Sequence, residues 1–225
     1  HRRHGVLFKF FSVCSVVKNG GKIMPMSKLT KSPLFWFISS ILAIVVMTFF
    51  GPEEATLGAN VRLVYLHGAW VLTAELLFAL AALIGLIALI SRKEAFYRWT
   101  TALGRSGIFY WISYLPLSMW AMQANWNGLF LAEPRFRLAM TFAIVGLLLQ
   151  LGLWMLNINW LTAFSNIAFI AALRFIFATA ENIMHPPPSP IFNSGNWAII
   201  GFFVGLNLLT WLSAYFVTRF FLPKG

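Results

Sequence analysis

The chain has 225 residues, of which 60% are hydrophobic and only 10% are charged. A soluble domain carries about 25% charged residues, and one core of this size cannot bury so much apolar surface. The composition therefore predicts a membrane protein. The 6 acidic residues are all Glu, and 4 His and 1 Cys are the other candidates for catalysis or metal binding. This excludes a disulfide framework, a cysteine zinc site and a cysteine-bound iron–sulfur cluster, and we expect no enzymatic activity.

The apolar residues gather in segments separated by short polar breaks. A helix that crosses the bilayer core needs about 20 of them. We predict an all-α fold, a polytopic bundle of about six transmembrane helices, with an N-terminal tail over 1–32, a membrane domain over 33–218 and a short tail over 219–225. The predicted spans are approximately 33–50, 61–90, 106–122, 137–156, 159–179 and 197–218.

The first 23 residues show no clear pattern, and the chain starts at His1 instead of a methionine. We interpret Met24 or Met26 as the natural start, so that 1–23 would not belong to the mature protein. A signal peptide over 5–17 is the alternative. No function is assigned to the potential metal ligands of this segment, which are His1, His4 and Cys14.

The net charge of +11 is unevenly distributed. Basic residues gather in the first 32 positions, in the loop region from Arg92 to Arg105, and at Arg219 and Lys224. The positive-inside rule then places both termini in the cytoplasm. We expect an integral protein of a bacterial-type inner membrane or an organelle inner membrane, in contact with lipid. The chain lacks the continuous basic face that nucleic-acid binding needs.

Two histidines remain outside the N-terminal segment, and the predicted topology puts both at the external face. His67 lies near the start of the second span, and His185 lies in the loop before the last span. Two neutral imidazoles can supply both axial positions of a haem iron. A lone interfacial histidine is more often an ordinary hydrogen-bonded residue, so the coincidence of the pair is the informative observation.

The sequence around both histidines resembles the haem-handling proteins of cytochrome c maturation, of the CcmC type. The stretch V-R-L-V-Y-L-H that ends at His67 is similar to the family's V-R-I-M-Y-I-H, and N-I-M-H-P around His185 is similar to N-T-L-H-Q-P. This resemblance implies six spans, haem b bound by the two histidines, and delivery of haem to a chaperone or partner subunit.

The family also carries a tryptophan-rich external segment, W-G-x-W-W-x-W-D-x-R, that cradles haem. The equivalent stretch here runs from Trp126 to Arg135 and keeps the first tryptophan, an acid and the arginine. Leu129, Phe130 and Ala132 replace the other three tryptophans. Flat indoles stack on a porphyrin, so their loss favours haem retention over haem transfer.

Other side chains near the external face complete the predicted site. Arg62, Arg135 and Arg137 are candidates for the haem propionates, or alternatively for lipid phosphates. Trp70 and Trp120 are candidate haem contacts, although interfacial tryptophans usually anchor helices at the headgroups.

Two ionisable residues fall inside the spans. Glu75 lies eight residues beyond His67 on nearly the same helix face, and Arg174 lies in the fifth span. We predict an ion pair between them that fixes the packing of the bundle, with a proton path or a cofactor tether as alternatives. Asparagines inside or between the spans are expected to form interhelical hydrogen bonds, namely Asn157, Asn159, Asn166 and Asn207.

Three functions remain open at this point. The favoured one is a membrane haem-binding protein that holds haem at the external face. The second is a structural subunit of a larger respiratory or photosynthetic complex, descended from the same family, which the missing tryptophans favour. The third is a chlorophyll-type pigment site, since one imidazole for each magnesium would be enough.

Overall fold

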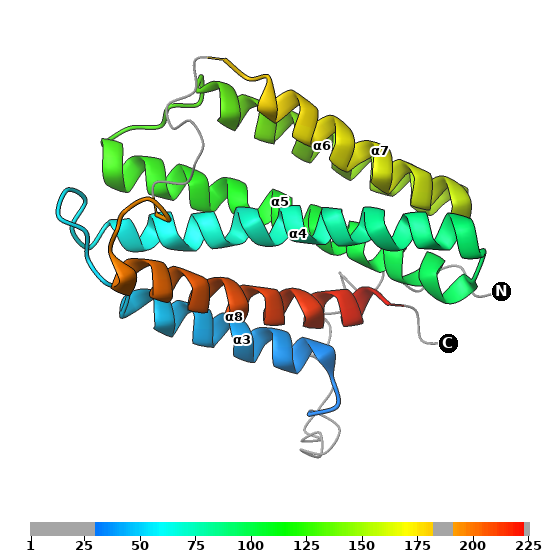
Figure 1. Cartoon of the computed structure of the whole chain (residues 1–225), viewed down its shortest axis with the longest axis horizontal. Helices are drawn as coiled ribbons and strands as arrows, with labels where there is room; N and C mark the ends of the chain where they lie inside the picture. The colour runs from blue at the N-terminus through cyan, green and yellow to red at the C-terminus, as the bar shows by residue number, and fades with distance from the viewer. Residues whose placement is uncertain (1–29, 182–190, 223–225) are drawn as a thin grey trace, which may run out of the picture.

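The computed structural model describes residues 30–181 and 191–222, and within these ranges it is all-α (Figure 1). The helices are α3 (Pro33–Phe49), α4 (Val61–Ser91), α5 (Glu94–Trp126), α6 (Pro134–Leu156), α7 (Asn159–Ala178) and α8 (Trp197–Phe221). Four of them, α4, α6, α7 and α8, are long and apolar enough to cross a membrane. This confirms a helical, integral membrane protein.

The predicted spans correspond to the observed helices except for the third. Instead of 106–122, α5 runs from Glu94 to Trp126, because the polar residues of its first turns lower its hydropathy without disfavouring the helix. It is not among the helices that composition marks as spans, and α3 is apolar but has only 17 residues.

Proline and asparagine set several helix ends. Pro33 and Pro134 occupy the first helical turn of α3 and α6, where a missing N–H costs nothing. Asn127 and Asn157 end α5 and α6 with φ of 51° and 53°, in the left-handed region that asparagine tolerates. Asn157 thus explains the break between α6 and α7.

The helices form three pairs that lie side by side (Figure 1). The central pair is α4 and α5, with α6 and α7 on one side and α3 and α8 on the other. The loops after α3 and α5 lie at one end of the bundle, which we call the loop end. The start of α3 and the end of α8 lie at the opposite end, the terminal end. This arrangement agrees with an even number of crossings.

Small polar side chains bridge the helices inside the core. The Thr73 hydroxyl donates to Thr210 Oγ1 at 2.9 Å, and Tyr110 and Ser213 share a hydrogen bond. Both links join the central pair to α8. Hydroxyl pairs of this kind satisfy polar groups where no water is present and let the helices approach closely.

Of the four asparagines, two form the predicted interhelical bonds. Asn166 on α7 donates to the Thr100 carbonyl of α5 at 3.0 Å, and Asn159 donates to the Glu94 carboxylate. Asn207 instead donates to Phe203 O within its own helix, because its amide faces back along α8. Asn157 serves as the helix end described above, which corrects the prediction for these two residues.

Candidate functional site

A cavity of about 430 Å³ opens at the loop end between α4, α5, α7 and the start of α6. Its volume lies in the range of about 300–1,000 Å³ typical of ligand pockets. We call it the histidine cavity, and the residues that line it are His67, Val71, Glu75, Trp111, Tyr114, Ser118, Met122, Trp126, Glu133, Arg135, Phe136, Arg174, Phe177 and Ala178.

His67 contributes a buried ring nitrogen without a hydrogen bond to this cavity. Its ring lies against Tyr114, with centroids 5.6 Å apart and planes at 51°. Its Nδ1 is buried and has no hydrogen-bond partner among the described residues. A buried polar atom without a partner costs about 1–3 kcal/mol, so a ligand that engaged the imidazole would offset a real penalty.

Glu75 and Arg174 form the ion pair that the sequence predicts. Arg174 Nη1 lies 3.0 Å from Glu75 Oε2, which joins α4 to α7 along the cavity wall. The Glu75 side chain is the more buried partner, with 25% exposed against 65% for Arg174. The remaining N–H groups of Arg174 make no hydrogen bond to any described residue, so the guanidinium can hold a second anion.

Trp126 and Arg135 also line the cavity, at its outer rim. Trp126 packs edge-on against Phe130 with ring centroids 5.7 Å apart. Arg135 follows the first residue of α6, whose start is capped by Glu133 through a 2.7 Å bond from the Phe136 N–H. Arg135 and Glu75 both line the cavity. The structure therefore brings both Trp126 and Arg135 to the cavity that contains His67.

Trp70 and Trp120 lie outside the lining of the cavity. Trp70 is buried in the core, where its Nε1–H donates to Ser113 Oγ at 2.8 Å and its ring lies 5.0 Å from Tyr110. Trp120 is 59% exposed on the outer surface of α5. Each indole points away from the cavity because of the rotation of its helix, so neither belongs to the candidate site.

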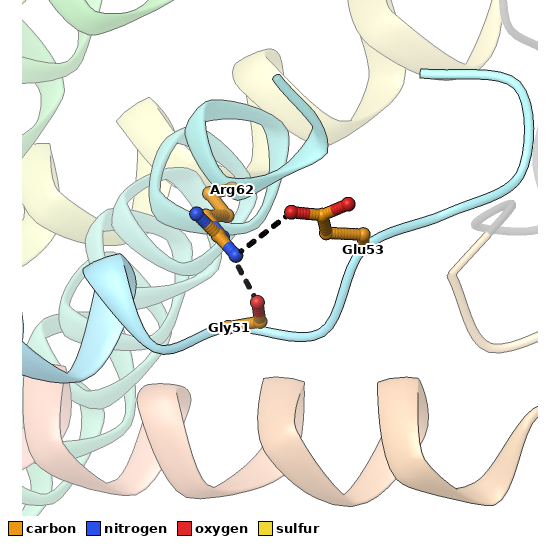
Figure 2. Close-up of polar contacts among 3 residues, drawn as sticks. All are labelled: Gly51, Glu53 and Arg62. Carbon is orange, nitrogen blue, oxygen red and sulfur yellow. Dashed lines mark hydrogen bonds and ion pairs between the residues drawn. The ribbon is translucent and has the colours of Figure 1, made fainter. Parts of the chain in front are cut away.

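Arg62 is engaged by the loop that precedes it (Figure 2). Its Nε–H donates to the Gly51 carbonyl at 2.9 Å, and its Nη2 lies 3.2 Å from Glu53 Oε1. The guanidinium therefore closes the connection between α3 and α4 instead of facing the cavity. Arg137 is exposed on α6 and likewise does not line the cavity.

The same loop is held by a second glutamate. The Glu54 carboxylate accepts hydrogen bonds from the backbone N–H groups of Leu57 and Thr56, both at 2.9 Å. These bonds favour the ionised form and hold the pKa of Glu54 below its ordinary value.

His185 lies outside the described residues, but both flanks of its loop are placed. Ala178, near the end of α7, lines the histidine cavity. Ile191, where the description resumes, brings its Cδ1 to 4.0 Å from the position a Cβ would take at Gly68. Ile191 therefore lies beside the residue that follows His67. His185 lies six positions before Ile191, a reach of at most about 20 Å.

Sequence reasoning missed the aromatic wall of the cavity. Trp111 and Tyr114 recur with Ser118, Met122 and Trp126 at spacings of three and four residues, which places them on one face of α5. The same periodicity relates His67, Val71 and Glu75 on α4. That spacing is the signal in the sequence that could have identified the lining.

The described residues contain no group of three or more His, Cys, Asp or Glu side chains that could hold a metal ion. His67 is the one histidine in the part of the chain that the structure describes. Comparisons with protein families, curated proteins and solved structures gave no match.

Proposed function

We propose that the protein binds haem b in the histidine cavity, with His67 as an axial ligand. The observation that carries this proposal is the buried, unpartnered Nδ1 of His67 in a cavity with aromatic walls. A haem iron accepts an imidazole nitrogen, and apolar rings suit the porphyrin face.

The other residues of the cavity fit the remaining parts of a haem. Trp111, Tyr114 and Trp126 supply aromatic surface. Arg135 and Arg174 supply cationic donors of the kind that pair with propionates. Four predicted residues are left out of this ligand set. Arg62 and Trp70 form hydrogen bonds away from the cavity, and Arg137 and Trp120 are exposed outside its lining.

His185 remains the proposed second axial ligand. The support comes from its place in the chain, after Ala178 of the cavity lining and before Ile191, which lies beside Gly68, and from the resemblance of its surroundings to the haem-handling family. When bound, the haem would supply a redox-active iron at the membrane surface, while the protein holds and orients it.

The biological role that follows is in cytochrome c maturation, as a haem-holding protein of a bacterial-type inner membrane or an organelle inner membrane. The distribution of basic residues supports cytoplasmic termini, which would put the histidine cavity at the external face. Haem and a haem chaperone or partner subunit are the proposed partners.

A second candidate function is that of a structural subunit in a larger membrane complex. The observation that favours it is the apolar surface at the loop end, where Leu129, Phe130 and Leu131 are 48%, 43% and 45% exposed. Leu129 and Phe130 occupy positions where the family has tryptophans, and the three exposed side chains together offer a contact for another subunit.

The direct test is the absorption spectrum of protein expressed with abundant haem. We expect a haem band in the wild type that is lost in His67→Ala and weakened in His185→Ala. Because a large-to-small change can also unfold the protein, His67→Gly with added imidazole is the companion measurement. Recovery of the band with imidazole identifies the lost group as the ligand.

A colourless wild type under these conditions would overturn the haem proposal. A stoichiometric subunit of a purified complex, unchanged by either histidine substitution, would favour the structural role instead.

A further inference from the structure

Two further cavities lie near the terminal end, between α5 and α6. One is an apolar groove of about 430 Å³, whose walls include Ile108, Ile112 and Leu147. The other is a polar cavity of about 330 Å³ that contains Arg98. Three residues line both, so the two form one continuous site, and these are Arg105, Gln150 and Trp154.

Two arginines of this site share it with one carboxylate, that of Glu94, among the residues that line it. Arg98 and Arg105 are seven residues apart on α5, two turns along one helix face, and both are partly buried. Neither forms a hydrogen bond or an ion pair with any residue that the structure describes. The nearby Glu94 instead accepts both bonds from the Asn159 amide.

An arginine beside an apolar groove at membrane depth is costly unless an anion accompanies it. The ligand that fits this site therefore has an anionic head and an apolar tail. Trp154 lies where the apolar and polar parts meet, as tryptophans do at the level of lipid headgroups.

We propose that this site binds an anionic phospholipid. Its phosphate would contact Arg98 and Arg105, and one acyl chain would occupy the groove beside Leu147. Basic pockets between transmembrane helices are known sites for anionic headgroups. The site lies at the opposite end from the histidine cavity and does not depend on haem binding.

The test is titration of detergent-purified full-length protein with phosphatidylglycerol and with phosphatidylcholine of identical chains, followed by native mass spectrometry. We expect phosphatidylglycerol to bind more tightly. Each basic residue near an anionic surface contributes about fivefold in affinity, so R98Q/R105Q should lose roughly 25-fold. Arg137→Gln removes an exposed arginine at the loop end and should bind as the wild type does.

Further variants separate the headgroup from the chain. Leu147→Trp should fill the groove and weaken phosphatidylglycerol while both arginines remain, and R98K/R105K should retain the preference for the anionic lipid. Glycerol 3-phosphate, which has the head without the chains, should not displace the lipid at equal concentration.

Equal binding of the two lipids, or wild-type binding by R98Q/R105Q, would overturn the proposal. Binding of glycerol 3-phosphate as tight as that of the lipid would show a simple phosphate site, and a stoichiometric polypeptide lost in Leu147→Trp would show a protein site. Size-exclusion profiles confirm that each variant is folded before titration.

Discussion

At the scale of single residues, two arginines close in sequence have different surroundings. Arg135 lines the histidine cavity, whereas Arg137 is exposed and outside the lining. Both occupy the first turn of α6, so they form a matched pair that differs in orientation alone. The proposed contact with a haem propionate can therefore be tested against an internal control.

We expect Arg135→Gln to weaken haem retention about tenfold, because a hydrogen bond to a charged group contributes about 1.5–3 kcal/mol. Arg137→Gln should retain haem as the wild type does. The measurement is haem transfer to excess apomyoglobin, followed by absorbance. Equal losses in both variants would show that only the overall positive charge of this end matters.

At the scale of helices, a glycine allows the close contact between α5 and α7. A Cβ at Gly104 would lie 2.7 Å from Asn166 Oδ1. That amide oxygen accepts a bond from Gln150 of α6, and the amide nitrogen donates to Thr100. The small residue therefore makes room for a polar network that joins three helices.

Gly104→Ala should lower the melting temperature by about 2–6 °C, because displacing Asn166 breaks this network at a cost of about 1–3 kcal/mol that exceeds the gain in helix propensity. Gly152→Ala is the control, since a Cβ there meets no atom within 4 Å, and it should leave the melting temperature unchanged or raised. Thermal unfolding in detergent, followed by circular dichroism, compares the two. Equal melting temperatures for both variants would contradict the packing argument.

At the scale of the whole molecule, the two ends of the bundle differ in charge and in contents. The terminal end carries Arg92, Lys93 and Arg219 together with the proposed lipid site, and the loop end carries the histidine cavity. By the positive-inside rule, this asymmetry supports the proposed orientation, in which the loop end is outside.

Single cysteines test that orientation in a Cys14→Ser background. We expect Ala55→Cys in the loop after α3 to react with a membrane-impermeant maleimide in intact spheroplasts. Ser91→Cys at the other end should react only after permeabilisation. Both positions are exposed, so accessibility within the fold does not limit either reaction. The reverse pattern would place the histidine cavity in the cytoplasm and remove its role in cytochrome c maturation.

The sequence by itself determined which segments form the helices of the bundle. Hydropathy located all six helices within the described ranges, and it failed only on the extent of α5, where charged first turns conceal a continuous helix. It also predicted the Glu75–Arg174 ion pair, because two opposite charges inside apolar segments have few partners other than each other.

Only the tertiary structure decided which side chains share the histidine cavity. Residues at one membrane level look equivalent in sequence, but the rotation of each helix about its axis is set by packing against its neighbours. That rotation buries Trp70 beside Tyr110 and turns Trp126 to the cavity. The loop after α3 binds Arg62 through the Gly51 carbonyl, whereas Arg135 lies at the cavity rim. The sequence indicates how close a residue lies to the membrane surface. Whether two residues share a cavity depends on how their helices pack in three dimensions.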